Sequence, residues 1–542
     1  MQTSPSLWWQ DGVIYHIYLR SFADDDGDGL GDLAGLISHL DHLNGDEHSL
    51  GVDAIWISPC FPSPDKDFGY DVADYVDIDP RYGTLADFDR LIREAHNRGI
   101  RVMLDLVFNH SSDQHAWFQE SHSSRSSPLR DWYIWKDARP GLLGRRPPNN
   151  WQAVFGGKAW TWDPRTEMYY HHLFLPEQPD LNWHSPSVRQ ALMDVVRYWL
   201  ERGVDGFRLD VFNAWFENAA YPDNPARLGL RGFDRQHHVH DISQPEMINA
   251  LAEFRALLDA YPQRTSVGEL FGRDPNLAAS YCGSDKLHMV FNFDFTDCPW
   301  QPTRFLRAIQ RWDTALAQGG WPCYVLSNHD VSRHVSRYGA SARDAVAKVA
   351  AALLLTLRGT PFLYYGEEIG LPDVRLRRDQ IVDPPGRRFW PLYKGRDPNR
   401  APMPWNDSTY GGFSSGTPWL PLHPSYSQRN VEAQRRDPDS VFSFYRALLQ
   451  LRRASLALRR GAFAPLTASP QRGLAYLRVG DREHALVALN FHRARLRLPL
   501  DQVVDPHDWD LALSSLPGSS ARLASDAVDL GPHEAAVFLS RG

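Results

Sequence analysis

The sequence is poor in cysteine, contains no long apolar run and is not basic. Its four cysteines are Cys60, Cys282, Cys298 and Cys323, and no CxxC spacing indicates a zinc site. Reduced thiols in a cytosol are therefore favoured over a disulfide framework. The most apolar stretch, residues 349–357, is far shorter than the roughly 20 residues that a bilayer requires. A formal net charge of −8 gives no electrostatic reason to expect a nucleic-acid or anionic-membrane partner.

The start of the chain also lacks the pattern of a secretory signal. The first twenty residues carry Asp11 and Arg20 and have no continuous apolar core before a small-residue cleavage site. We therefore expect a cytoplasmic protein without a membrane partner.

What the sequence does have is a long alternation of strand-like and helix-like segments, from residue 13 to about residue 454. A chain of 542 residues is too long for one core and suggests two or three domains. The helical patterns include residues 85–98, 188–202 and 244–259. The eight candidate strands are residues 13–18, 54–58, 102–108, 206–211, 265–268, 289–293, 324–327 and 362–365. This alternation predicts an α/β fold, a closed (β/α)8 TIM barrel.

Two segments depart from the barrel pattern. Residues 111–182 follow the third strand, are rich in Ser, Pro, Gly and Trp, and are too long for a structureless loop. After residue 460 the pattern changes to short alternating segments typical of antiparallel strands. We predict a barrel domain at 1–110 and 183–460, an inserted domain B at 111–182, and a C-terminal β domain at 461–542.

Four short motifs place chemically active side chains at the ends of predicted strands. They are Asp105-Leu-Val-Phe-Asn-His110, Gly206-Phe-Arg-Leu-Asp-Val-Phe-Asn213, Ser266-Val-Gly-Glu-Leu270 and Leu326-Ser-Asn-His-Asp330. A barrel brings such strand ends to one face, so the four motifs are expected to converge on one pocket. Cleavage of a glycosidic bond needs two carboxyl groups beside the anomeric carbon. Asp210 and Glu269 are the candidate pair, and Asp330 is a third catalytic carboxylate.

The neighbours of the two carboxylates suggest different roles. Arg208 and Asp210 point to the same face of an extended strand, and a nearby arginine favours the ionised carboxylate that a nucleophile needs. Glu269 follows an apolar run, and Val267, Leu270 and Phe271 are expected to raise its pKa by desolvation. A raised pKa suits a general acid at neutral pH.

An acidic loop near the start of the chain is a candidate metal site. Asp24, Asp26, Asp28 and Asp32 alternate with glycines, which gathers hard oxygen ligands around a tight turn. The twelfth position is Gly35, not the glutamate of an EF-hand. A Ca²⁺ or Mg²⁺ site is predicted, with a solvated acidic turn as the alternative; no organic cofactor is expected.

With these motifs in place, the chain resembles the α-amylase superfamily, glycoside hydrolase family 13, in its α-glucosidase and oligo-1,6-glucosidase branch. The resemblance also rests on Gly51-Val-Asp-Ala-Ile-Trp-Ile-Ser-Pro59, Gln178-Pro-Asp-Leu-Asn182 and Gly359-Thr-Pro-Phe-Leu-Tyr-Tyr-Gly-Glu-Glu368. It implies a barrel with an inserted B domain and a C-terminal β-sandwich.

The resemblance implies a role for each candidate residue. Asp210 is expected to be the nucleophile, Glu269 the acid/base and Asp330 the group that holds sugar hydroxyls. Asp67 is expected to pair with Arg400 and close the pocket behind one glucose. The other expected substrate-binding residues are Tyr70, His110, Phe155, Phe174, Arg208, Val211 and His329. A structural Ca²⁺ is expected on Asp24, Asp26, Asp28, the Leu30 carbonyl and Asp32.

The implied function is a retaining, exo-acting α-glucosidase that hydrolyses non-reducing terminal α-1,4 or α-1,6 bonds of short oligosaccharides. A covalent glucosyl–Asp210 intermediate would also allow transglucosylation. Val211 directly follows the nucleophile and bears on linkage, which stays open. The alternatives are a trehalose-related hydrolase or isomerase and, more distantly, a non-catalytic binding homologue. The expected partner is a small oligosaccharide, and the chain is expected to be a monomer or small homo-oligomer.

Overall fold

Eight parallel strands form the central sheet of the computed structural model, which describes residues 7–141, 144–339, 343–468, 472–501, 504–519 and 521–540. They are β1 (Ile14–Ile17), β2 (Ala54–Ile57), β3 (Arg101–Leu106), β9 (Gly206–Leu209), β10 (Thr265–Gly268), β11 (Met289–Val290), β12 (Cys323–Val325) and β13 (Thr360–Tyr364). Their order is β11-β10-β9-β3-β2-β1-β13-β12. Each overlaps one of the eight predicted strands, so the predicted barrel is confirmed.

The two ends of this sheet meet at β11 and β12. The thiol of Cys323 on β12 donates to the carbonyl of Val290 on β11 across a Sγ–O distance of 3.2 Å. Within the sheet, the parallel register sets Asp105 of β3 beside Arg208 of β9. The strands are buried on both sides, as parallel strands covered by helices must be.

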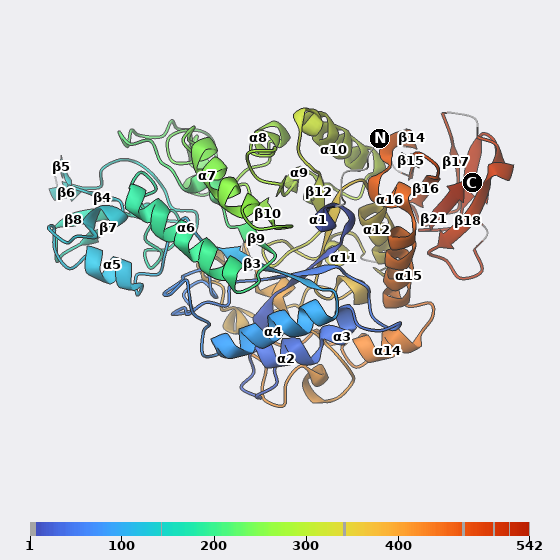
Figure 1. Cartoon of the computed structure of the whole chain (residues 1–542), viewed down its shortest axis with the longest axis horizontal. Coiled ribbons are helices and arrows are strands. Elements are labelled where there is room, and N and C mark those ends of the chain that lie inside the picture. Colours follow the sequence, from blue (N-terminus) through green and yellow to red (C-terminus); the bar gives the residue numbers. More distant parts are fainter. Residues whose placement is uncertain are drawn as a thin grey trace.

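Helices cover the outside of the barrel (Figure 1). The longer ones are α4 (Leu85–Asn97), α6 (Pro186–Glu201), α7 (Met247–Asp259), α10 (Pro302–Ala315), α12 (Arg343–Thr356) and α15 (Val441–Ala454). The shorter ones are α1 (Trp8–Asp11), α2 (Leu33–Ser38), α3 (Leu40–Leu43), α5 (Ala116–Ser121), α8 (Pro275–Ser280), α9 (Phe293–Thr296), α11 (His334–Tyr338), α13 (Pro384–Phe389), α14 (Val431–Arg436) and α16 (Leu456–Arg460).

Helix α4 shows how the sequence determines such an element. Thr84 and Asp87 form a capping box that satisfies backbone N–H groups at its start. Its buried residues Phe88, Leu91, Ile92 and Ala95 recur at helical spacing and face the barrel.

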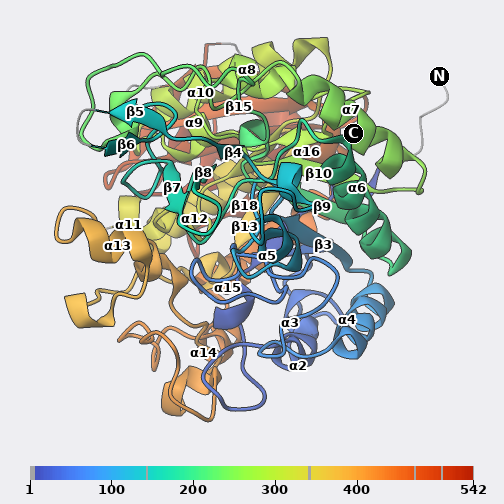
Figure 2. The same cartoon turned by 90° about the vertical axis from the view of Figure 1, so that its left-hand side faces the viewer.

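The segment between β3 and α6 forms small antiparallel sheets. Strands β4 (Trp135–Lys136), β8 (Met168–His171) and β7 (Trp160–Asp163) make one sheet, and β5 (Arg139–Gly141) pairs with β6 (Gly144–Arg146). An aromatic cluster that includes Trp151 and Trp160 forms its core. The segment lies at the end of the molecule opposite the C-terminal strands, in front of the barrel in Figure 2.

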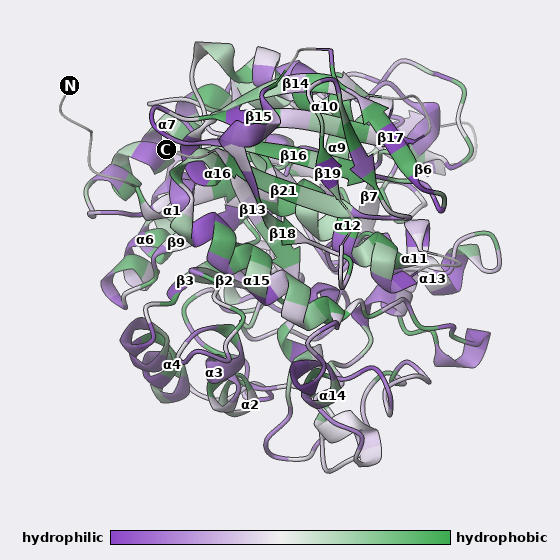
Figure 3. Ribbon diagram, turned by 90° about the vertical axis from the view of Figure 1, so that its right-hand side faces the viewer, coloured by the Kyte–Doolittle hydropathy of each residue, from purple (hydrophilic) through white to green (hydrophobic). Residues whose placement is uncertain are grey.

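The C-terminal part contains two antiparallel sheets. Five strands, β14 (Ala462–Ala468), β15 (Gly473–Val479), β16 (His484–Asn490), β21 (Ala535–Ser540) and β18 (Trp509–Ser514), form one sheet. The other contains β17 (Leu496–Pro499), β20 (Ala527–Leu530) and β19 (Arg522–Leu523). Leu486 and Phe538 of the first sheet share a buried cluster with Leu498 and Val528 of the second, which makes a sandwich core. Figure 3 shows β16 and β21 coloured mainly as hydrophobic.

Two further expectations concern the whole chain. Across the described ranges, no helix is both long enough and apolar enough to cross a membrane. All four cysteines are buried and free, which confirms the absence of a disulfide framework among them.

Candidate active site

The candidate site lies at the carboxyl ends of the barrel strands. Asp210 follows β9, Glu269 follows β10, and Asp330 lies in the loop after β12. They line a cavity of about 280 Å³ together with the predicted residues Asp67, Tyr70, His110, Phe155, Phe174 and Val211. Seven lining residues were not predicted as pocket residues: Val154, Arg231, Leu270, Phe271, Pro385, Tyr393 and Arg396.

Arg208 lies at the centre of the carboxylates. One terminal nitrogen of its guanidinium donates to Asp105 Oδ1 and to Asp210 Oδ1, each at 2.7 Å. The other terminal nitrogen forms an ion pair with Glu269. Arg208 is fully buried and does not line the cavity itself. It therefore holds the two candidate carboxylates, Asp210 and Glu269, close together.

The pKa values of Asp210 and Glu269 are both raised. Burial raises the pKa of Glu269 to about 8. The positive charge of Arg208 lowers this pKa, and the charges of Asp210 and Asp330 offset part of that lowering. Burial also raises the pKa of Asp210 to about 7, with a further rise from Asp105 and Asp330. The sequence-based expectation that Arg208 favours ionised Asp210 gives only one of these contributions. A pKa raised in this way keeps the Glu269 carboxyl protonated near neutral pH, as a general acid requires.

Asp330 lies in a different electrostatic environment. Although burial opposes ionisation, the positive charges of Arg396 and Arg400 lower the pKa of Asp330 well below its usual range. Arg400 donates to Asp330 Oδ1 at 2.9 Å and Arg396 donates to the same oxygen at 3.3 Å. Asp330 is therefore a fixed negative charge at the edge of the cavity.

The predicted pair between Asp67 and Arg400 is wrong. Asp67 instead forms an ion pair with Arg396, with 2.5 Å between Oδ1 and the guanidinium nitrogen. Arg400 is fully buried, bonds to Asp330 and to the carbonyl of His329, and does not line the cavity. The loop carries two arginines four residues apart, and side-chain direction selects Arg396 for Asp67.

Arg396 is fixed from two sides. Asp383 accepts from its guanidinium at 2.7 and 2.9 Å, and the ring of Phe155 lies 5.1 Å from its guanidinium carbon. The Asp67–Arg396 pair therefore joins the loop after β2 to the loop after α13, and Phe155 adds the inserted segment to this contact. No sequence spacing links residues so far apart, which is why this contact was missed.

The wall around Tyr70 is a hydrogen-bonded stack. The Tyr70 ring stacks on His329 with 5.2 Å between ring centroids, and its hydroxyl lies 2.7 Å from His329 Nε2. Burial lowers the pKa of His329 to about 3, so this ring is neutral at working pH. His329 lies behind the cavity wall, whereas His110 lines it and its Nε2 lies 3.0 Å from the Tyr70 carbonyl.

Val211 has a strained backbone. Its φ of 32° is in the left-handed region, which a β-branched residue rarely adopts. The turn directs the chain away from β9 immediately after Asp210, and the Val211 side chain lines the cavity. Strain at such a position is typical of functional sites.

The acidic loop brings part of the predicted metal set together. Carboxylate oxygens of Asp24, Asp26 and Asp28 lie within 4.8 Å of one another. Asp32 uses its carboxylate differently: one oxygen accepts from Gly35 N–H at the start of α2 and the other from Asp25 N–H. The donor set of hard oxygens fits a Ca²⁺ ion.

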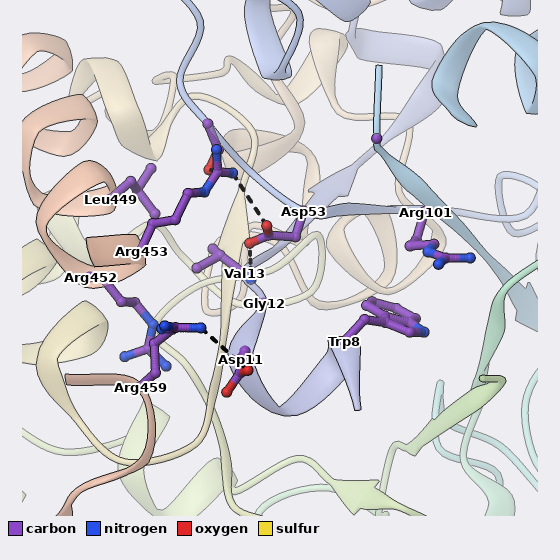
Figure 4. Close-up of a pocket in the computed structure, with 12 residues that line it drawn as sticks. Trp8, Asp11, Gly12, Val13, Asp53, Arg101, Leu449, Arg452, Arg453 and Arg459 are labelled. Atoms are coloured by element: carbon purple, nitrogen blue, oxygen red, sulfur yellow. Dashed lines mark hydrogen bonds and ion pairs between the residues drawn. The ribbon is translucent and has the colours of Figure 1, made fainter. Parts of the chain in front are cut away.

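A second cavity, of about 290 Å³, lies at the opposite end of the barrel (Figure 4). Val13, Asp53 and Arg101 lie there, where β1, β2 and β3 begin. Arg452 donates from this region to the carbonyls of Leu355 and Gly359. The amino-terminal face of such a barrel commonly serves stability, so the cavity at the carboxyl ends is the candidate active site.

Comparison with known proteins agrees with this geometry. The family model described as "Alpha amylase, catalytic domain" matches residues 16–461. The chain therefore belongs to the α-amylase catalytic-domain family.

A Rhizobium meliloti (strain 1021) protein named "Probable alpha-glucosidase" is 48% identical over 84% of each chain. The oligo-1,6-glucosidase of Parageobacillus thermoglucosidasius is 37% identical over 99% of each chain. The crystal structure of the α-glucosyl transfer enzyme XgtA superposes with a TM-score of 0.92 at 43% identity, covering 99% of this chain and 100% of that one. Relatives named for trehalose-6-phosphate hydrolysis and trehalulose synthesis also match, at 38% and 33% identity.

Proposed function

We propose that the protein is a retaining, exo-acting α-glucosidase that releases glucose from the non-reducing ends of short α-glucosides. The observation that carries this proposal is the cavity itself, which has Asp210, Glu269 and Asp330 on one side and the Asp67–Arg396 ion pair on another. In this proposal the ion pair would block a longer chain from extending beyond the first sugar. The α-glucosidases among the relatives support the same activity.

In the first chemical step, Asp210 attacks the anomeric carbon while Glu269 protonates the leaving oxygen. Both carboxylates contact the guanidinium of Arg208, which supports the close spacing of about 5–5.5 Å that retaining enzymes use. Arg208 also stabilises negative charge on Asp210 when the sugar leaves.

In the second step, Glu269 acts as a base and activates water, which releases glucose from Asp210. The permanently ionised Asp330 is placed to bind sugar hydroxyls and to stabilise the positive charge that develops on the ring. An acceptor hydroxyl in place of water would give transglucosylation, the reaction class for which XgtA is named. The α-1,4 and α-1,6 linkages both stay open.

A time-resolved product panel tests the proposal. Maltose, isomaltose, trehalose, sucrose and soluble starch are incubated with the enzyme, and the anomer of released glucose is followed by proton NMR. Immediate α-glucose from the disaccharides, with starch almost untouched, is expected. Early β-glucose from sucrose, whose other product is fructose, would contradict retention. Internal cleavage of starch would contradict exo action, and a strong preference for trehalose would favour the trehalose-related alternative.

Covalent catalysis is tested separately with Asp210→Asn. We expect a loss of turnover of about 10³-fold or more with an unchanged circular dichroism spectrum, because the nucleophile is lost. Near-normal turnover in the variant would contradict the mechanism, whereas absence of turnover in the wild-type protein would favour a binding homologue.

We also propose that the loop of Asp24, Asp26 and Asp28 binds a structural Ca²⁺, together with the Leu30 carbonyl and Asp32 as implied by the family. The clustering of three carboxylates supports this assignment. The ion would neutralise the loop and would take no part in the chemistry.

The four free, buried cysteines support a reducing compartment, and we propose a cytoplasmic enzyme.

A further inference from the structure

The cavity at the amino-terminal end of the barrel has a basic lining (Figure 4). It lies between the starts of β1, β2 and β3 and the helices α15 and α16. Its charged lining residues are four arginines and two aspartates, namely Arg101, Arg452, Arg453, Arg459, Asp11 and Asp53. The lining therefore carries two more positive charges than negative ones.

Arg452 is a buried cation without an anion in contact with it. About 1% of its surface is exposed. Its terminal nitrogens donate to the carbonyls of Leu355 at 2.7 Å and Gly359 at 2.6 Å, and its Nε is buried without a partner. Within the described ranges it bonds to carbonyls alone, which carry no net charge. Its positive charge is therefore poorly compensated, which is costly in a protein interior.

The other two arginines on this side keep hydrogen-bond donors for a ligand. In the described part of the chain, Arg459 makes one hydrogen bond, at 3.4 Å to Asp11, and its Nε is buried without a partner. Asp11 is already held by Arg460 at 2.7 and 2.8 Å. Arg453 shares one terminal nitrogen between a backbone carbonyl at 3.1 Å and Asp53 at 3.3 Å. The Arg453 side chain is 54% exposed, so solvent reaches the cavity on this side.

Trp8 and Arg101 lie across the cavity from these arginines (Figure 4). Trp8 Nε1 donates to the carbonyl of Gln263 at 2.8 Å, which holds the indole in place. Arg101 is paired with Asp205 at 2.9 Å, so most of the uncompensated charge lies on α15 and α16. The indole adds an apolar surface of the kind that packs against C–H groups. At about 290 Å³ the cavity is at the lower limit of small-molecule pockets.

We infer that this cavity binds a phosphate dianion, either free or as the monoester of a small sugar. Guanidinium groups match phosphate oxygens in geometry and in charge. A dianion would balance the two surplus positive charges of the lining, whereas a single carboxylate would leave one of them. The bound anion would join α15 and α16 to the starts of the first three barrel strands.

Calorimetric titration of the full chain tests this inference without any measurement of activity. Inorganic phosphate and glucose 6-phosphate are added at about pH 7.5, above the second phosphate pKa of about 6. We expect one site per chain with a Kd of about 0.1 mM or lower. We also expect a rise in Tm of at least about 2 °C at saturating ligand. Sodium chloride at the same ionic strength is the control for salt effects.

Two variants locate the site. Arg453→Ala and Arg459→Gln should each weaken binding of the phosphate ligand at least tenfold. Both should keep the circular dichroism spectrum of the wild-type protein, because Arg453 is exposed and Arg460 continues to hold Asp11. Arg436→Ala is the matched control, since Arg436 is an exposed arginine on α14 outside the cavity.

The two ligands distinguish the two sources of the phosphate group. Tighter binding of glucose 6-phosphate, by tenfold or more and lost in Trp8→Ala, would identify a sugar monoester. Equal affinities would identify phosphate itself. Absence of binding by both ligands would overturn the inference. So would a Tm rise that sodium chloride reproduces, or binding that is unchanged in Arg453→Ala and Arg459→Gln.

Discussion

Arg396 lies 2.5 Å from Asp67 in the wall of the candidate cavity, although their positions are 329 apart in the chain. The same guanidinium contacts Asp330 and Asp383, so one side chain connects the closed end to the third carboxylate. The depth of the pocket therefore depends on Arg396.

Arg396→Ala should reduce kcat/KM for maltose by about 100-fold or more, because it leaves the buried Asp67 unpaired, a loss worth about 3–5 kcal/mol. It should also raise the ratio of maltotetraose to maltose hydrolysis, because the closed end of the pocket is opened. Steady-state kinetics on the maltose series would measure both effects. Arg377→Ala is the control, since Arg377 pairs with Asp379 on the surface and should change neither value.

Arg400→Ala should behave differently from Arg396→Ala. Arg400 contacts Asp330 and not Asp67, so its loss should lower activity by a similar factor on substrates of every length. A selective loss on disaccharides would instead restore the sequence-based pairing with Asp67. The comparison uses the same kinetics series, with Tm recorded for both variants.

The pH dependence of kcat/KM should be bell-shaped. Asp210 must be ionised, so activity should fall as the pH drops below about 7, and Glu269 must be protonated, so it should fall above about 8. Because Asp210 and Glu269 interact, these two pKa values belong to the pair and not to either residue alone. In Glu269→Gln, an aryl α-glucoside with a good leaving group should retain cleavage and lose the alkaline limb. An alkaline limb that persists in this variant would show that another group is the acid.

Val211→Gly should cost little stability. Relief of the left-handed backbone is worth about 1–2 kcal/mol for a residue with a Cβ, which offsets the loss of buried side-chain area. Val267→Gly on β10 is the matched control, because Val267 is fully buried in an extended strand and should lower Tm much more. Thermal melts compare the two, and equal losses would remove the argument for strain.

The same Val211→Gly variant should change linkage preference. Removal of the side chain next to Asp210 widens the cavity beside this carboxylate, so the maltose-to-isomaltose ratio should shift by about tenfold. An unchanged ratio would show that other lining residues select the linkage.

Removal of divalent cations should lower the Tm of the wild-type protein, and added Ca²⁺ should restore it. Ca²⁺ at 100 times its Kd should add about 2.7 kcal/mol to the free energy of unfolding. Asp28→Asn should weaken this response, because Asp28 belongs to the carboxylate cluster. Asp25→Asn is the control, since Asp25 lies in the same loop outside the cluster. A calcium response that is unchanged in Asp28→Asn would exclude the loop as the site.

Local sequence patterns predicted the fold better than they predicted contacts between residues far apart in the chain. The strand before Glu269 and the strand before Asp210 were found because buried parallel strands are short apolar runs with their active residues at the end. The partner of Asp67 was not found, because two arginines four residues apart in an irregular loop present the same chemistry. Only the path of the folded loop determines which of them points at Asp67.

The contact between His171 on β8 and Glu217 after β9 illustrates the same limit. His171 and Glu217 are unremarkable in sequence, and their meeting depends on how the inserted segment lies on the barrel. The raised pKa of Asp210 has a similar origin: Arg208 is visible two residues away, whereas Asp105 and Asp330 come from other strand ends. Convergence of strand ends predicts that such groups meet and does not predict how their charges balance.

Arg208 contacts three carboxylates but carries a single positive charge. The resting enzyme therefore retains a proton among Asp105, Asp210 and Glu269 near neutral pH, before any sugar arrives. Bond cleavage can draw on this stored proton instead of waiting for one from bulk solvent. In the proposed mechanism, each catalytic cycle must return the proton to Glu269, and the water molecule that releases glucose supplies it.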